Sequence, residues 1–103
     1  MENQSLEIAQ TIIDQIKFAD RSALMAWGAT KFMALPESKE FQGGVQFKVN
    51  GLSFVGTVVV QLRWVDDYVV SFVKNNKIEH SVSGVYCDML VDIIDYVENK
   101  KVA

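Results

Sequence analysis

Three aspartates near the C-terminus have the spacing of one helix face. Asp88, Asp92 and Asp95 lie four and three residues apart, which places them on the same side of an α-helix. Grouped carboxylates do acid–base chemistry only if burial or mutual repulsion moves their pKa values apart. An exposed acidic face is the simpler interpretation, and its functional form is an electrostatic patch for a basic partner. We therefore assign these aspartates to partner binding rather than to catalysis.

The other reactive side chains are too few for a catalytic or metal site. His80 is the only histidine and Cys87 the only cysteine, and no close pair of strong metal ligands accompanies either residue. Cys87 falls in the first turn of the expected last helix, where packing is its simplest role. Gly43-Gly44 lacks the lysine and hydroxyl residue of a phosphate-binding loop. We expect a protein that is not an enzyme and has no metal and no cofactor.

Length and composition indicate one folded domain. Half of the 103 residues are hydrophobic and one is a proline, so residues 1–103 should form a single α+β domain with one core. No apolar run approaches the roughly 20 residues that span a bilayer, and the acidic N-terminus is unlike a signal peptide. A lone cysteine builds no disulfide framework. These features predict a cytoplasmic protein with no membrane partner.

The net charge of −3 is unevenly distributed along the chain. Residues 1–20 carry one lysine against four acids, and residues 84–103 carry two lysines against four acids. Residues 21–83 carry seven basic residues against five acids. The ends of the chain are therefore acidic and its middle is faintly basic, which is far from the concentrated positive charge of a duplex-binding protein.

Residues 45–64 have the pattern of a β-hairpin. Asn50-Gly51 is the dipeptide most favoured in a two-residue type I′ turn, so Val49 should pair with Leu52. The resulting register places a continuous apolar set on one face of the sheet: Val45, Phe47, Val49, Leu52, Phe54, Val58, Val60, Leu62 and Trp64. A shift of one residue would exchange the two faces, so burial should hold this register.

The opposite face of the hairpin mixes polar and aliphatic side chains. We assign its polar members to partner binding: Gln46, Lys48, Gln61 and Arg63. Its valines, together with those of the next strand, are Val55, Val59, Val69 and Val73. This is more aliphatic surface than a solvated sheet needs. Either an N-terminal helix covers the face, or the face contacts another protein or a second copy in a homodimer.

The flanking segments complete an α+β fold. Residues 5–28 should form a helical N-terminal segment, with Gly28 as a natural C′ residue. Residues 45–82 should form the antiparallel sheet, with a three-residue loop that pairs Trp64 with Tyr68. Ser83 should cap a C-terminal helix over residues 84–100. Thr30–Leu35 fits either a helix or a strand, so the predicted fold is a four- or five-stranded antiparallel meander with N-terminal helices and one C-terminal helix.

Four short motifs follow one another along the chain. They are GATKFM in residues 28–33, FKVNG in residues 47–51, DDYVVSF in residues 66–72 and VYCDML in residues 85–90. Their order resembles that of small uncharacterised phage, prophage and mobile-element proteins with a GG-N-K-F-like segment, a β-meander and a V-Y-x-D-x-L helix. Ala29-Thr30 departs from the glycine and asparagine of that family. The resemblance implies a strand at Thr30–Leu35 and a mobile-element origin, but no activity and no functional residue.

These observations lead to two hypotheses for function. The favoured one is a non-catalytic protein-interaction module of a phage or mobile element, acting in the host cytoplasm, whose acidic surfaces inhibit a host protein such as a defence protein. The alternative is a single-stranded nucleic-acid-binding accessory protein that uses Lys48, Arg63 and Lys74. The alternative is weaker because Phe47 and Phe54 should point to the other face of the sheet, away from any bases that would stack on them.

Overall fold

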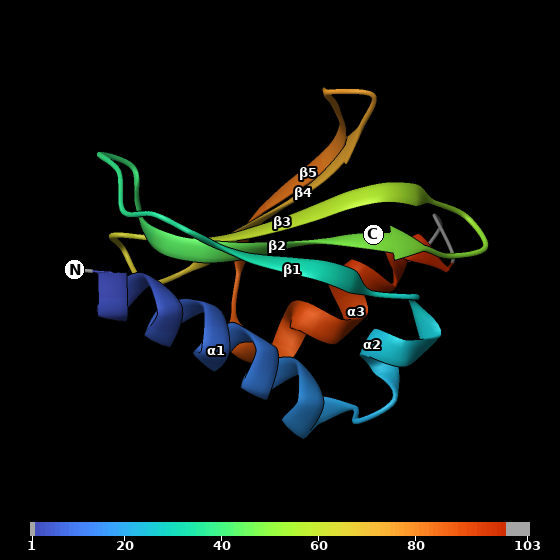
Figure 1. The fold of residues 1–103 in the computed structure, drawn as a ribbon, viewed down its shortest axis with the longest axis horizontal. Helices are drawn as coiled ribbons and strands as arrows, with labels where there is room; N and C mark the ends of the chain where they lie inside the picture. Colours follow the sequence, from blue (N-terminus) through green and yellow to red (C-terminus); the bar gives the residue numbers. More distant parts are fainter. Residues whose placement is uncertain (1, 99–103) are drawn as a thin grey trace.

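The computed structural model describes residues 2–98, which form a five-stranded sheet with all its helices on one side (Figure 1). The elements in chain order are α1 (Glu2–Ala19), α2 (Ala23–Ala26), β1 (Thr30–Leu35), β2 (Phe41–Asn50), β3 (Val55–Arg63), β4 (Tyr68–Lys74), β5 (Lys77–Val85), η1 (Cys87–Met89), α3 (Leu90–Ile94) and η2 (Asp95–Val97). Each strand pairs antiparallel with the next one in sequence. The predicted α+β class and antiparallel meander are confirmed.

Thr30–Leu35, for which the sequence allowed either a helix or a strand, forms the edge strand β1. Ala34 pairs with Val45 and Leu35 with Gly44, while a bulge interrupts the register between Thr30 and Met33. Pro36 follows directly and ends the strand, because proline has no N–H to donate to a ladder. The sheet therefore begins at Thr30 and not at residue 45.

The core lies between the sheet and the helices. Ile12 and Ile16 of α1 are fully buried, and so are Leu90 and Ile94 of α3. The sheet contributes Val45, Phe47, Val58, Val60, Val70 and Phe72, and the end of α2 contributes Trp27. Each fully buried side chain of this kind stabilises the fold by about 1.5–3 kcal/mol relative to exposure. Both ends of the chain thus cover the same face of the sheet.

The predicted register of β2 with β3 is wrong, although the predicted faces are right. Val49 pairs with Gly56 and not with Leu52, because the strands are joined by the four-residue loop 51–54. The shift of four residues is even, so the side chains within both strands keep their faces. Leu52 was predicted on the apolar face but lies in the loop and is 91% exposed. Neither Asn50 nor Gly51 has the positive φ of a type I′ turn. The turn preference of this dipeptide is therefore overridden.

The C-terminal turn explains why the loop is longer. The N–H groups of Ser53 and Phe54 both donate to the carbonyl oxygen of Val97, at 2.9 and 3.0 Å. Phe54 folds under the sheet, where its ring lies 5.6 Å from that of Phe72. Gly51 packs so closely on Val97 that an added Cβ would lie 2.2 Å from Val97 Cγ1. A two-residue turn would have taken these N–H groups into the β-ladder.

The turn between β3 and β4 also differs from its prediction. Tyr68 pairs with Leu62 rather than Trp64, and Trp64 remains 49% exposed in the loop instead of joining the core. The Arg63 N–H donates to the Asp67 carbonyl oxygen at 2.8 Å, and Asp66 adopts a φ of 68°. These two features close a longer loop. Tyr68 is nevertheless buried on the core face, as expected.

The C-terminal segment is shorter and less regular than the predicted helix over residues 84–100. Strand β5 continues to Val85, which pairs with Tyr68, so Ser83 lies in a strand and caps nothing. Gly84 has a φ of 67°, and Tyr86 is extended before η1 begins at Cys87. Only η1, α3 and η2 are helical, and residues 99–100 of the predicted helix lie outside the described residues.

Substitution of Gly51 tests the contact that sets the β2–β3 loop. Gly51→Ala should lower the free energy of unfolding by about 1–3 kcal/mol, because the new methyl group must displace the backbone or side chain of Val97. Leu52→Ala is the matched control, since that neighbouring side chain is 91% exposed. Urea unfolding of both variants measures the difference, and equal stability of the Gly51 variant and the wild type would contradict the packing.

Candidate protein-binding surfaces

The sheet separates the predicted partner-binding residues into two groups. The helices that carry the aspartates all lie on one side of the sheet (Figure 1). Gln46, Lys48 and Gln61 alternate along their strands with buried residues such as Phe47 and Val60, so they lie on the other face. No single site unites the two groups. They form two separate surfaces.

The three aspartates are in different environments. Asp88 and Asp92 are exposed, as an acidic patch requires. Asp95 is partly buried, and its Oδ1 accepts a hydrogen bond from Nε1 of the buried Trp27 at 3.3 Å. This contact joins η2 to the end of α2, which is 68 residues away in sequence. Asp95 therefore has a partner inside the molecule, and only the other two aspartates are free for an outside one.

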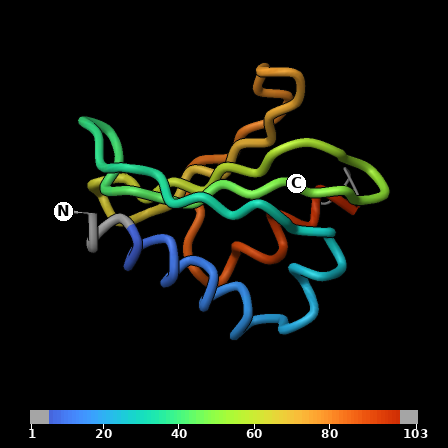
Figure 2. Tube along the Cα trace, in the orientation of Figure 1, coloured from blue at the N-terminus to red at the C-terminus, as the bar shows by residue number. Residues whose placement is uncertain are grey.

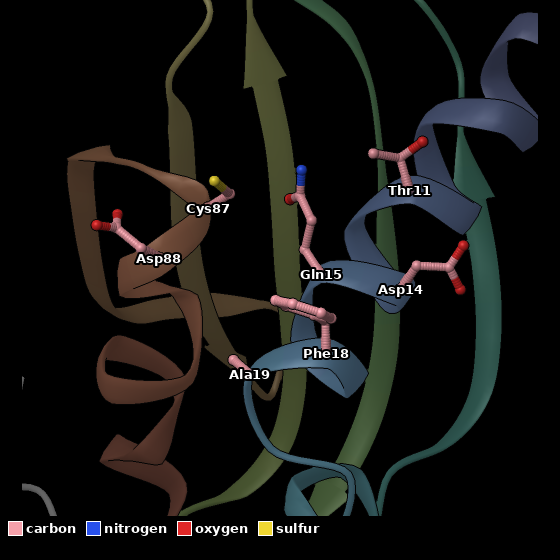
Figure 3. Close-up of a pocket in the computed structure, with 7 residues that line it drawn as sticks. All are labelled: Thr11, Asp14, Gln15, Phe18, Ala19, Cys87 and Asp88. Carbon is pink, nitrogen blue, oxygen red and sulfur yellow. The ribbon is translucent and has the colours of Figure 1, made fainter.

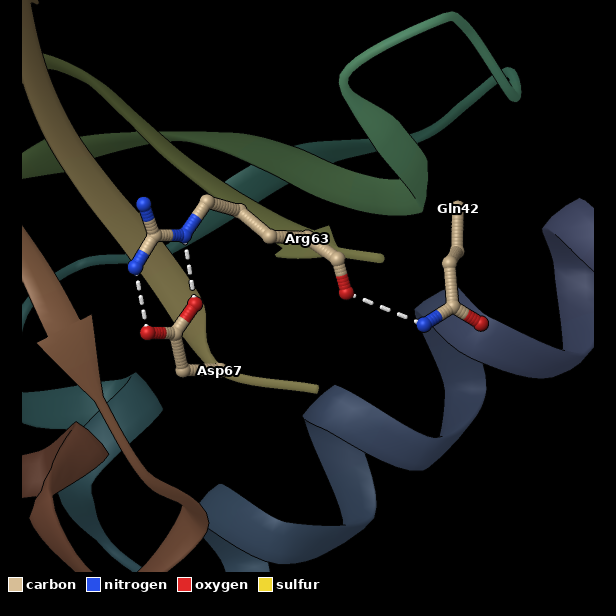
Figure 4. Close-up of polar contacts among 3 residues, drawn as sticks. All are labelled: Gln42, Arg63 and Asp67. Atoms are coloured by element: carbon tan, nitrogen blue, oxygen red, sulfur yellow. Dashed lines mark hydrogen bonds and ion pairs between the residues drawn. The ribbon is translucent and has the colours of Figure 1, made fainter. Parts of the chain in front are cut away.

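Arg63 is likewise engaged within the molecule. Its Nε donates to Oδ1 of Asp67 at 2.5 Å, and its Nη2 pairs with Oδ2 (Figure 4). Its carbonyl oxygen accepts a hydrogen bond from Nε2 of Gln42 at 3.0 Å. The side-chain hydrogen bond with Arg63 lowers the pKa of the Asp67 carboxyl below its ordinary value. The bidentate pair closes the β3–β4 turn, so Arg63 offers little free charge to a ligand.

The open sheet face has no helical cover among the described residues. Helix α1 packs on the opposite side through Ile12 and Ile16, so the expected alternative of an N-terminal helix over the valines is wrong. Val55 is exposed, whereas Val59, Val69 and Val73 are half-buried within the curved sheet. Their half-burial arises from neighbouring strands. The face remains accessible to another molecule.

A groove on the helical side lies between α1 and η1, and we call it the α1–η1 groove. It has a volume of about 550 Å³ (Figure 3). Its lining residues are Thr11, Asp14, Gln15, Phe18 and Ala19 from α1, with Cys87 and Asp88 from η1. The Phe18 side chain is 94% exposed. An unburied phenyl ring thus stands in a groove between two carboxylates.

The position of Phe18 follows from the phase of α1. Ile12 and Ile16 define the buried stripe, and Phe18 lies two residues, or about 200°, further around the helix. Asp14 precedes Phe18 by four residues and therefore shares its outer face. Sequence reasoning missed Phe18 because it considered only the apolar stripe. The available signal was an aromatic residue outside that stripe.

His80 lies in an aromatic stack beneath the sheet. Its ring is 4.6 Å from that of Tyr96 and 5.7 Å from that of Phe72, and its Nε2 has no hydrogen-bond partner in the described structure. The Tyr96 hydroxyl donates to Glu79 Oε2 at 3.0 Å, and burial raises the pKa of this tyrosine. Among residues 2–98, no group of three or more His, Cys, Asp and Glu side chains is placed to hold a metal. The stack is a packing feature.

Comparisons with known proteins identify no relative. No family model, curated protein or solved structure matches the chain. Within residues 2–98, none of the helices is both long and apolar enough to cross a membrane. The candidate surfaces are therefore argued from their geometry and charge.

The inward contact of Asp95 gives a prediction about stability. Asp95→Ala should cost about 1–3 kcal/mol of unfolding free energy, because it leaves the indole N–H of the buried Trp27 without an acceptor. Asp92→Ala removes an exposed carboxylate and should change stability by less than about 0.5 kcal/mol. Chemical denaturation compares the two variants. Equal effects would show that Asp95 is a surface residue like its neighbour.

The Arg63–Asp67 pair gives a prediction about pH dependence. A carboxyl whose pKa is lowered by folding stabilises the native state above its ordinary pKa of about 3.9, and this contribution is lost as the pH falls through the lowered value. Asp67→Asn should therefore flatten the loss of stability between neutral pH and about pH 3. Asp92→Asn, at an exposed site, should leave that loss unchanged. Urea midpoints across this range measure both slopes, and identical slopes for the two variants would contradict the prediction.

Proposed function

We propose that this protein is a non-catalytic protein-interaction module and that the α1–η1 groove binds a basic partner protein. The observation that carries the proposal is Phe18, which is 94% exposed in a groove flanked by Asp14 and Asp88. Aromatic side chains are enriched at the centres of protein interfaces, where burying one contributes much of the binding energy. A solvent-exposed phenyl ring has no comparable role within the monomer.

Charge on the helical side defines the partner's chemistry. The exposed acids of α1, η1 and α3 are Glu7, Asp14, Asp88 and Asp92, and Asp20 follows α1, whereas the same side offers Lys17 and Arg21. Such a surface attracts a partner that presents lysine or arginine around an apolar side chain. The apolar group would fill the groove beside Phe18. The rim charges would accelerate association and make it sensitive to salt.

The biological setting of the proposal comes from the sequence. The four motifs that resemble those of phage, prophage and mobile-element proteins support an origin in a mobile element. A module of this kind would act in the host cytoplasm by occupying the surface of a host protein, such as a defence protein, and inhibiting it. The nucleic-acid alternative has less support, because Phe47, Phe54 and Phe72 are all buried on the helical side of the sheet.

Site-specific crosslinking tests the groove. A photoreactive phenylalanine analogue at position 18 should capture a host protein, and the same analogue at Leu52, which is also almost fully exposed, should not. With the captured protein purified, Phe18→Ala should weaken binding by about 30-fold, as expected for an aromatic anchor worth about 2 kcal/mol. The Phe18→Ala substitution should leave the free energy of unfolding within about 0.5 kcal/mol of the wild-type value.

Charge variants complete this test. Asp14→Lys with Asp88→Lys should weaken the same complex and reduce its salt dependence. Glu37→Lys with Glu40→Lys makes the same change of net charge at exposed positions outside the groove and serves as the control. Capture at position 52 but not at position 18, or full affinity after loss of the Phe18 ring, would overturn the proposal.

A further inference from the structure

A second groove lies at the start of β3 and the end of β4, and we call it the β3–β4 groove. It has a volume of about 630 Å³, and its lining includes Lys48, Val55, Thr57, Val73, Lys74 and Asn75. The β4–β5 hairpin bends away from the sheet on the side opposite the helices, as both ribbon and trace show (Figures 1 and 2). The end of the β4–β5 hairpin and the start of β3 both contribute to the lining of the groove.

None of the residues that line this groove carries a carboxylate. Strands β1 to β4 contain Lys31, Lys48, Arg63 and Lys74 but no aspartate or glutamate, in a chain whose net charge is −3. Arg63 is neutralised by Asp67. Lys48 and Lys74 are exposed, line the groove and form no ion pair within residues 2–98. The charge of the groove is therefore complementary to an anionic ligand.

The apolar part of the groove decides which anion fits. Val55 and Val73 supply an aliphatic surface, and Thr57 and Asn75 add uncharged polar groups. No aromatic side chain lines the groove, although single-stranded nucleic acids are held mainly by stacking of bases on aromatic rings. Aliphatic side chains of a peptide can pack on the valines while its carboxylates face the lysines. The chemistry thus favours a peptide over an oligonucleotide.

The irregular edge strands do not favour binding of a peptide as an additional strand of the sheet. Edge strand β1 has a bulge between Thr30 and Met33, and edge strand β5 pairs irregularly with β4 on both sides of Ser81. Bulges interrupt the row of backbone groups that an added strand would need. A peptide would therefore dock in the groove through its side chains and not as an added strand.

We propose that the β3–β4 groove binds an extended acidic segment of a second protein, with the carboxylates of the segment at Lys48 and Lys74 and its aliphatic side chains on Val55 and Val73. This surface lies across the sheet from the α1–η1 groove and does not depend on the function proposed for that groove. The molecule would then hold two partners of opposite charge on its two sides.

A peptide titration tests this proposal. The probe is a fluorescein-labelled peptide of about ten residues with alternating glutamate and valine, and the readout is fluorescence anisotropy at low and high salt. Lys48→Glu with Lys74→Glu should weaken binding by about tenfold or more, which corresponds to about 1.4 kcal/mol. Lys17→Glu with Lys39→Glu makes the same change in net charge outside the groove and should alter the affinity less than twofold. All four lysines are exposed, so matching unfolding midpoints should confirm intact folds.

Each other outcome would overturn the proposal. Absence of peptide binding at low salt, or equal weakening by both pairs of substitutions, would remove the groove as the site. Tighter binding of a labelled oligothymidine of the same length would identify the face as a nucleic-acid surface. A dimer in sedimentation that Val59→Lys dissolves, with peptide binding gained on dissociation, would identify a second copy of the chain as the occupant.

Discussion

The fold depends on the docking of η2 against the loop between β2 and β3. One carbonyl oxygen, that of Val97, accepts two hydrogen bonds from this loop, and the absence of a side chain at Gly51 lets the two backbones meet. The neighbouring Asp95 binds Trp27, and Tyr96 stacks on His80. Three successive residues therefore connect the C-terminal turn to α2, to the β2–β3 loop and to the edge strand β5. This turn sets the strand register and closes the core.

Both ends of the chain cover the same face of the sheet, and this arrangement determines where the acidic side chains lie. The acidic ends of the sequence are brought together on the helical side, while strands β1 to β4, which have no carboxylate, form the other side. The α1–η1 groove thus pairs an exposed phenyl ring with two carboxylates, whereas the β3–β4 groove combines two lysines with aliphatic side chains. Composition alone would not reveal two surfaces of opposite sign.

The sequence predicts the faces of the sheet better than its turns, because the two depend on different physics. Side-chain parity survives any even shift, so Phe47 and Tyr68 were placed correctly although both of their registers were wrong. A dipeptide adopts its preferred turn only when no distant part of the chain forms competing contacts with the same backbone. Asn50-Gly51 lost its preferred turn to Val97, whereas Asn75-Asn76 has no such competitor and adopts positive φ at both residues.

The candidate sites follow the same division between local and distant effects. Exposure of Asp88 and Asp92 could be predicted, because it follows from helical spacing. The inward contact of Asp95 could not, since its partner lies 68 residues away. The C-terminal helical segment exists but begins later than predicted, because the pairing of Val85 with Tyr68 extends β5 into residues that look helical in isolation.

The α1–η1 groove joins segments from the two ends of the chain, so it exists only when both ends are packed on the sheet. Every strand pairs with its neighbour in sequence, and such local contacts allow hairpins to form early in folding. The contacts of the chain ends are far more distant in sequence and cost more loop entropy to form. A ligand of the α1–η1 groove therefore selects the fully closed chain over any partly folded one. Its binding free energy adds to the stability of the native state through mass action, and unbound chains lose that contribution.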